Sequence, residues 1–143
     1  MNIDSIENGL VIDHITAGQG MRLYELLGLG NTDVSIALIQ HVNSKKLGKK
    51  DIIKIDSAEL KVDLDIIGFV DPDATVNVIK NGKLVRKLSI ELPKQLVGVL
   101  KCNNPRCITT TEQELPQIFR LTDKENKVYR CKYCEVSGKV RTK

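Results

Sequence analysis

Four cysteines in the last third of the chain, arranged as two close pairs, constrain the fold more than any other feature of the sequence. Cys102 and Cys107 form a C-x4-C pair, Cys131 and Cys134 form a C-x2-C pair, and the 143-residue chain contains no other cysteine. Two short turns joined by a longer loop can supply four thiolates to one tetrahedral ion. The spacing therefore predicts a closed structural Zn²⁺ site, with no ligand position left for a reactive water.

Three other interpretations use the same cysteines. Two disulfide bonds would suit an oxidising compartment, but the first residues do not contain the apolar segment of a signal peptide. A redox enzyme could use the pair Cys131-Lys132-Tyr133-Cys134, although such pairs usually accompany a βαβ pattern that is absent around it. An iron–sulfur cluster also takes four cysteines. The spacing favours structural zinc over these alternatives.

Leu92-Pro93 indicates a boundary between a first domain, residues 1–95, and a second domain, residues 96–143. In the second domain, predicted strands at 96–100 and 128–130 each lead into a cysteine pair. A segment of about 48 residues is too small for a secure apolar core. We therefore expect the metal to supply folding free energy to this domain.

Charge is distributed unevenly between the two predicted domains. Residues 1–95 carry 12 Lys and Arg against 13 Asp and Glu, whereas residues 96–143 carry 10 against 5. The basic second domain supports an alternative hypothesis, a zinc-ribbon protein that binds nucleic acid. Three tyrosines and two phenylalanines offer few surfaces for base stacking, which argues against it. No apolar run approaches the roughly 18 residues of a membrane span, and free-thiol zinc chemistry leads us to expect a cytoplasmic protein.

Hydrophobic patterning in the first domain predicts the order β-α-β-β-α-β, followed by one further hairpin strand. The predicted strands are residues 10–15, 34–42, 52–55, 75–79 and 84–86. The predicted helices are residues 21–29 and a segment that begins at Asp56 or Ser57 and ends before Asp71-Pro72-Asp73. Residues 44–50 are predicted to form a loop, and Asn81-Gly82 a tight hairpin turn. This order favours an α+β domain with helices on one face of a mainly antiparallel sheet.

Basic side chains are the main candidate binding groups in the first domain. They form two groups in the sequence: Lys45, Lys46, Lys49, Lys50 and Lys54, and then Lys83, Arg86 and Lys87. Such groups usually form a solvated surface, but they can also hold phosphates. Thr75 and Asn77 alternate along one strand and would point to the same side of it. The sequence lacks the P-loop, G-x-G-x-x-G, H-E-x-x-H and G-x-S-x-G motifs, and neither His14 nor His41 stands in a recognisable catalytic motif.

Four ordered blocks resemble the regulatory subunit of aspartate carbamoyltransferase, and together they extend over essentially the whole chain. The first three blocks are Gly9-Leu10-Val11-Ile12-Asp13-His14-Ile15, Gly48-Lys49-Lys50-Asp51-Ile52-Ile53-Lys54-Ile55 and Ala74-Thr75-Val76-Asn77. The fourth is the cysteine pattern, which closes with Cys131-Lys132-Tyr133-Cys134-Glu135. Four such blocks in this order form a specific signature.

The resemblance implies a non-catalytic protein of pyrimidine biosynthesis with two domains. Residues 1–95 would form a ferredoxin-like allosteric domain that binds CTP as inhibitor and ATP as activator at one site. Residues 96–143 would form a small all-β, zinc-ribbon-like domain that holds one Zn²⁺ and docks on catalytic chains. Regulatory dimers would then bridge two catalytic trimers into a dodecamer of six and six chains.

The resemblance also implies roles for individual residues. The implied nucleotide-binding residues are Ile6, Val11, Asp13, His14, Lys50, Lys54, Thr75, Asn77, Ile79 and Lys87. The implied docking residues are Asn104, Lys132 and Glu135. Three places depart from the family pattern: Asp4-Ser5 where Asp/Glu-Ala is frequent, Gly82 where a pocket tyrosine is common, and Arg106 where asparagine is usual.

Overall fold

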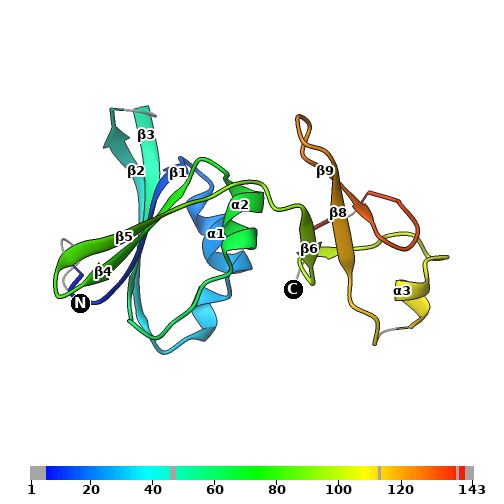
Figure 1. Cartoon of the computed structure of the whole chain (residues 1–143), viewed down its shortest axis with the longest axis horizontal. Helices are drawn as coiled ribbons and strands as arrows, with labels where there is room; N and C mark the ends of the chain where they lie inside the picture. The colour runs from blue at the N-terminus through cyan, green and yellow to red at the C-terminus, as the bar shows by residue number, and fades with distance from the viewer. Residues whose placement is uncertain (1–5, 46–47, 113, 138, 141–143) are drawn as a thin grey trace. The chain divides into compact units, whose positions relative to one another are not determined.

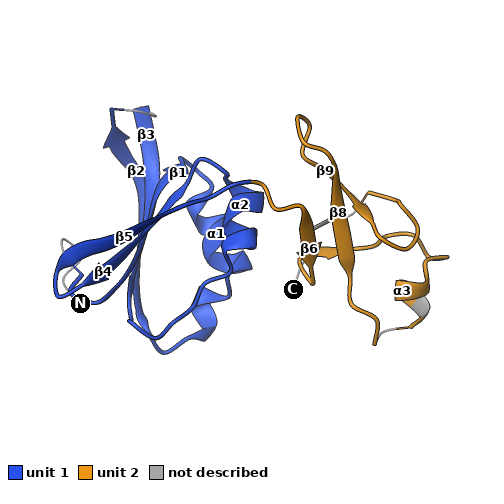
Figure 2. Ribbon diagram, in the orientation of Figure 1, with its two compact units in different colours: residues 1–91 blue, residues 92–143 orange. Residues whose placement is uncertain are grey.

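The computed structural model describes residues 6–45, 48–112, 114–137 and 139–140, so Asp4, Ser5 and Lys46 lie outside the described residues. The chain divides into two compact units, unit 1 with residues 1–91 and unit 2 with residues 92–143 (Figure 2). Within the described part of the chain, no helix has the length and hydropathy that a bilayer-spanning segment needs.

Unit 1 is a five-stranded antiparallel sheet with two helices packed on one face (Figure 1). Its elements are β1 (Gly9–Thr16), α1 (Gly20–Leu26), the 3₁₀ helix η1 (Leu29–Asn31), β2 (Ser35–Ser44), β3 (Gly48–Asp56), α2 (Leu64–Val70), β4 (Thr75–Lys80) and β5 (Lys83–Ser89). The strand order is β2-β3-β1-β4-β5, which places β1 at the centre. The predicted α+β class is confirmed, and the first four strands with their two helices have the ferredoxin-like order.

The core of unit 1 lies between the sheet and its helices. Ile12 pairs with Ile53 on β3 and with Val76 on β4, and all three side chains are fully buried. Leu23 of α1 and Ile67 of α2 belong to the same buried cluster. Because residues paired across antiparallel strands share a face, this row identifies the face that the helices cover. We call the opposite side of the sheet the helix-free face.

A bulge in β1 interrupts the alternation of side chains between the two faces. The pairing with β3 shifts between Ile12 and Ile15, so that three steps on β1 match two steps on β3. His14 takes a positive φ of 57° within the bulge. Ile12 and Ile15 are both fully buried, although a regular strand would place them on opposite faces. The two intervening residues, Asp13 and His14, therefore share the helix-free face.

The structure corrects the predicted loop at residues 44–50. β2 continues to Ser44 and β3 begins at Gly48, with Asn43 paired to Lys49 and Val42 to Lys50. Polar composition suggested a loop, but most of these residues lie on an exposed extension of the β2–β3 hairpin, where strand pairing does not require apolar side chains. Gly48 starts β3 at a φ of 77°, which glycine adopts without strain.

The second predicted helix begins later than expected. α2 starts at Leu64, because Asp63 caps it by accepting hydrogen bonds from the backbone N–H of Asp65 at 2.9 Å and of Ile66 at 3.4 Å. Asp56 and Ser57 are the two predicted caps. Asp56 ends β3, and Ser57 does accept N–H groups from Glu59 and Leu60, but the turn it forms does not continue as a helix. The first helix is also shorter than predicted and ends at Leu26.

Unit 2 is a small β-rich unit built around the cysteines. Its elements are β6 (Gln95–Val97), β7 (Leu100–Lys101), α3 (Ile108–Thr111), β8 (Ile118–Asp123), β9 (Val128–Cys131) and β10 (Lys139–Val140). One sheet has the order β6-β8-β9, and β10 pairs with β7. The predicted strand 96–100 is split at Gly98, whose φ is 75°. The apolar core of unit 2 is small, and its buried residues include Leu96, Phe119 and Tyr129. A core of this size agrees with a unit whose stability depends on the cysteine cluster.

The carboxylate of Asp51 joins three segments of unit 1 from a fully buried position. It accepts backbone N–H groups from Gly18 at 3.0 Å, from Gly20 at 2.9 Å and from His41 at 3.0 Å. A Cβ atom at Gly20 would lie 2.8 Å from the carboxylate oxygen, so only glycine allows this approach. His41 lies in a bulge of β2, where the pairing with β3 shifts between Ile39 and Val42. The contacts of Asp51 therefore fix the start of α1 and this bulge against β3.

We predict that Asp51→Ala lowers the free energy of unfolding of unit 1 by about 3 kcal/mol, because three buried N–H groups lose a charged acceptor. Asp56→Ala on the same strand is the matched control, since Asp56 is exposed and its loss should change stability by less than about 0.5 kcal/mol. Urea unfolding followed by far-ultraviolet circular dichroism measures both. Equal stability of the two variants would contradict the role of Asp51.

Candidate functional site

Most of the predicted nucleotide-binding residues fall on the helix-free face, in rows that cross the sheet. Lys54 of β3, Val11 of β1, Asn77 of β4 and Lys87 of β5 are paired in succession and form one row. Asp13 and Thr75 are paired in the next row. Ile79 lies two residues beyond Asn77 and pairs with Leu84. Residues as far apart in the sequence as Val11 and Lys87 therefore share one face.

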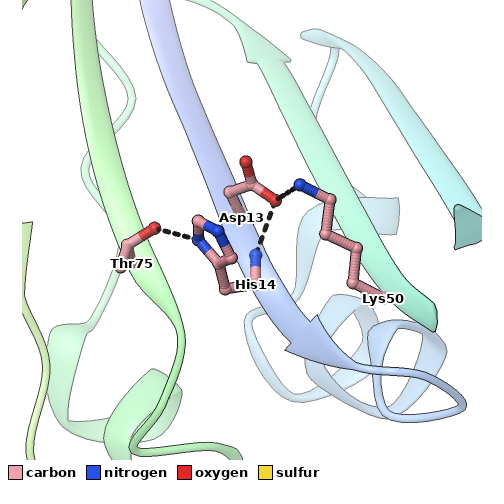
Figure 3. Close-up of polar contacts among 4 residues, drawn as sticks. All are labelled: Asp13, His14, Lys50 and Thr75. Carbon is pink, nitrogen blue, oxygen red and sulfur yellow. Dashed lines mark hydrogen bonds and ion pairs between the residues drawn. The ribbon is translucent and has the colours of Figure 1, made fainter. Parts of the chain in front are cut away.

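The β1 bulge brings a small polar network onto this face (Figure 3). Lys50 Nζ lies 2.9 Å from Asp13 Oδ1, and the same oxygen accepts the backbone N–H of His14 at 2.6 Å. His14 Nδ1 lies 3.2 Å from Thr75 Oγ1, which links β1 to β4. The network holds four predicted residues together and links the charged group on β3 to the hydroxyl on β4.

The charge state of Asp13 follows from these contacts. Burial raises the pKa of the carboxyl, but the Lys50 ammonium and the His14 backbone N–H outweigh burial and leave the pKa below its ordinary value. Asp13 therefore stays ionised near neutral pH and compensates part of the positive charge of the lysines. Lys50, Lys54 and Lys87 give this face more cationic than anionic groups among the residues of the predicted site.

Asn77 carries an oxygen without a partner. Its Oδ1 atom is buried and makes no hydrogen bond within the part of the chain that the structure describes. Buried polar atoms normally have a partner, and leaving one unpaired costs free energy. Asn77 stands in the row between Lys54 and Lys87, so a ligand on this face that offers a donor would satisfy it.

Ile6 and Gly82 lie at one end of the predicted site. Ile6 is buried, and one of its methyl groups lies 3.0 Å from where a Cβ of Gly9 would stand. Gly82 has a φ of 74°, and its N–H donates to Glu7 O at 2.9 Å. The glycine therefore closes the β4–β5 turn in a conformation that a tyrosine would adopt only with strain.

Sequence reasoning did not include Leu84 and Ser89 among the site residues. Leu84 pairs with Ile79 and Ser89 pairs with Thr75, so both belong to the rows that carry the predicted residues. Counting along β5 from Lys87 with a period of two would have found Ser89. The same count misses Leu84, because the pairing of β4 and β5 shifts between Val78 and Ile79.

The four cysteines form a second candidate site, in unit 2. One sulfur from each lies within 4.8 Å of the other three, and Cys102, Cys107 and Cys131 are buried. The Sγ atoms of Cys102 and Cys134 are 3.4 Å apart, and those of Cys107 and Cys131 are 3.7 Å apart. A disulfide needs about 2.05 Å, and the described cysteines are free. Sulfurs around one tetrahedral ion at about 2.3 Å would lie about 3.8 Å apart, so the cluster has the dimensions of a metal site.

The thiols in this cluster have unequal pKa values. Burial raises the pKa of Cys102 to about 12, and it also raises the pKa of Cys131. At Cys107, burial acts in the same direction, but the hydroxyl and backbone N–H of Thr109 outweigh it and lower the pKa to about 7. Four thiolates this close repel one another, and a cation at their centre removes that cost.

The predicted docking residues lie on the two loops that carry the cysteines. Asn104 belongs to the C-x4-C loop, where its carbonyl accepts the N–H of Cys107 at 3.0 Å and its Oδ1 accepts the N–H of Arg106 at 3.0 Å. Lys132 and Glu135 are exposed at the C-x2-C turn. Glu135 has a φ of 67°, and its N–H donates to Cys131 O at 2.8 Å. Hydrogen bonds within the two cysteine loops therefore set the backbone conformation of Asn104 and Glu135, whereas the N–H of Lys132 donates to Ile118 O of β8 at 2.8 Å.

Known proteins match the chain over nearly its whole length. Residues 1–91 match a family described as the aspartate carbamoyltransferase regulatory chain, allosteric domain, and residues 94–140 match its metal binding domain. The aspartate carbamoyltransferase regulatory chain of Clostridium tetani is 48% identical over 140 residues, which cover 98% of this chain and 97% of that protein. The Clostridium botulinum chain is 50% identical over 135 residues, with 94% and 92% covered. The Bifidobacterium longum chain is 44% identical over 140 residues, with 98% and 100% covered.

We predict that Cys102→Ser unfolds unit 2 and leaves unit 1 intact, because a metal site supplies much of the folding free energy of so small a unit. Hydrogen exchange followed by mass spectrometry should show loss of protection in β8 and β9 and unchanged protection in β1 and β3. Treatment of the parent protein with a chelator should give the same pattern without any substitution. Retained protection in β8 and β9 in both experiments would contradict the prediction.

Proposed function

Because the chain belongs to the family of aspartate carbamoyltransferase regulatory chains, we propose that it binds the nucleotide effectors CTP and ATP on the helix-free face of unit 1 and docks on catalytic chains through unit 2. As a regulatory chain it is a non-catalytic subunit of an enzyme complex. Its place in pyrimidine biosynthesis is then to adjust the activity of the catalytic chains. We also propose a cytoplasmic location, which the free cysteines support.

The unpaired Asn77 oxygen between two lysines is the observation that carries the nucleotide proposal. The row from Lys54 to Lys87 crosses four strands, or about 14 Å of sheet at the usual strand spacing. Within it, ammonium groups suit phosphates, and the amide of Asn77 offers the oxygen that a base or ribose donor requires. Val11 and Ile79 provide apolar surface for the base or ribose, with Ile6 at the end of the site.

The Asp13 network gives the proposed site its local charge balance. Lys50 would contact ribose or phosphate, and its ion pair with Asp13 holds the ammonium near the bulge. Thr75 and His14 connect this contact to β4 and border the same face. An effector changes catalysis only if it binds one quaternary state of the complex better than another, and such coupling is typically about 1–3 kcal/mol.

The metal of unit 2 is proposed to be one Zn²⁺ per chain. The donor set consists of four thiolates from Cys102, Cys107, Cys131 and Cys134, and their mutual distances fit a tetrahedral ion. Four protein ligands complete the coordination of zinc, so its contribution is structural. It would link the loop that carries Asn104 to the turn that carries Lys132 and Glu135.

In this proposal, unit 2 docks on catalytic chains and unit 1 pairs regulatory chains. Asn104, Lys132 and Glu135 would contact a catalytic chain, and Arg106 beside them replaces the usual asparagine with an exposed cation. Two regulatory chains would pair through their allosteric units, and each pair would bridge two catalytic trimers. The basic charge of residues 96–143 was the main support for the nucleic-acid hypothesis, and we propose no such function.

We predict that Lys54→Gln and Lys87→Gln each weaken CTP binding to the isolated chain about 10-fold, since one charge-assisted contact contributes about 1.5–3 kcal/mol and a factor of ten corresponds to about 1.4 kcal/mol. Lys80→Gln is the matched control, because Lys80 lies on β4 three residues beyond Asn77 and therefore on the other side of the strand. Isothermal titration calorimetry gives the three affinities. If all three variants bind CTP as the parent does, Lys54 and Lys87 are not part of the site.

A further inference from the structure

Thr109 is in direct contact with a metal-ligand sulfur. Its Oγ1 lies 3.1 Å from Cys107 Sγ, and the two residues are 3% and 2% exposed. A thiolate bound to a metal has no proton, so the hydroxyl donates this hydrogen bond. The bond draws electron density away from one sulfur of a four-thiolate cluster and fixes the direction of its lone pairs.

Gln117 connects the first cysteine to the backbone of Thr109. Its Oε1 accepts the N–H of Cys102 at 3.0 Å, and its Nε2 donates to Thr109 O at 3.4 Å. A side chain needs an acceptor at one end and a donor at the other to make both bonds, which an amide provides. The Gln117 backbone is itself fixed, because its carbonyl accepts the N–H of Gly98 at 2.8 Å and the next residue starts β8.

The C-x4-C loop has more need of such support than the C-x2-C turn. Four residues separate Cys102 from Cys107, against two between Cys131 and Cys134, so more backbone freedom must be lost to bring the first pair of sulfurs together. The hydroxyl of Thr110 closes the loop further by donating to Cys107 O at 2.5 Å, within reach of Asn104 O at 3.1 Å. Side chains of α3 and of Gln117, the residue before β8, therefore both support the loop.

We propose that Thr109 and Gln117 are positioning residues that hold Cys102 and Cys107 in ligating geometry and thereby set how slowly the metal leaves unit 2. The inference rests on the metal binding proposed above. The two residues act differently: Thr109 contacts a ligand sulfur, whereas the hydrogen bonds of the Gln117 side chain within the described residues go to the backbone of Cys102 and Thr109. Outer residues of this kind typically change metal affinity by about 10- to 100-fold.

The first test measures zinc release from the full chain into excess EDTA, with the apoprotein thiols titrated at the end. Thr109→Val and Gln117→Leu should each release zinc about 10-fold faster than the parent. Thr109→Ser keeps the hydroxyl and should stay within about twofold of the parent. Thr122→Val is the matched control, because Thr122 is exposed on β8 and its hydroxyl donates to a backbone carbonyl, that of Val128, at 3.4 Å. If Thr109→Val does not fold with metal, Thr109→Ala repeats the test without a branched apolar group.

The second test distinguishes contact with the sulfur from a merely structural effect. In the Co²⁺-loaded chain, Thr109→Val should shift the thiolate-to-cobalt charge-transfer band to lower energy, because the sulfur loses a hydrogen-bond donor, and Gln117→Leu should leave the band in place. Parental release rates together with an unchanged band in the Thr109 variants would overturn the inference. A parent chain that binds neither Zn²⁺ nor Co²⁺ would instead refute the metal site on which the inference rests.

Discussion

The buried carboxylate of Asp51 is the interaction on which the architecture of unit 1 depends. Asp51 of β3 is paired with Ile15 of β1, and its side chain lies on the helix-covered face. There the carboxylate accepts hydrogen bonds from the N–H groups at the start of α1 and in the bulge of β2. Lys50, the preceding residue, reaches Asp13 on the other side of the sheet. Two consecutive residues of β3 therefore serve opposite faces of the sheet: Asp51 anchors the helix layer, and Lys50 presents a cation on the helix-free face. The position of the candidate effector site is thus tied to the packing of the core.

Unit 2 is held together differently from unit 1, because its apolar core is too small to fix its loops by packing alone. The four cysteine sulfurs gather the C-x4-C loop and the C-x2-C turn at one point, and the candidate docking residues lie on these same segments. A docking surface on such loops keeps its shape only while the sulfurs stay together. Thr109 and Gln117 extend this arrangement from the metal ligands to α3 and β8.

The sequence predicted the element order of unit 1 because its strands alternate or run apolar and its turns carry Gly, Asn and Pro. It predicted the cysteine cluster because ligand spacing is a local property. It could not place the start of α2, since Ser57 and Asp63 are both good caps and tertiary packing decides between them. Nor could it show the β1 bulge, which puts Asp13 and His14 on one face, or the contacts of Gln117 and Asp51, which join segments distant in sequence. The basic side chains and the alternation of Thr75 and Asn77 are visible in the sequence pattern, but the full set of effector residues and their individual roles came from the family resemblance and stay a prediction.

We propose that this chain docks on catalytic chains and transmits a nucleotide signal to them. The most direct measurement mixes the zinc-loaded chain with aspartate carbamoyltransferase catalytic trimers and follows sedimentation and the dependence of activity on aspartate, with and without CTP and ATP. We expect a larger assembly whose aspartate saturation curve shifts when either nucleotide is added. Trimers that sediment unchanged, or an assembly whose saturation curve ignores both nucleotides, would contradict it.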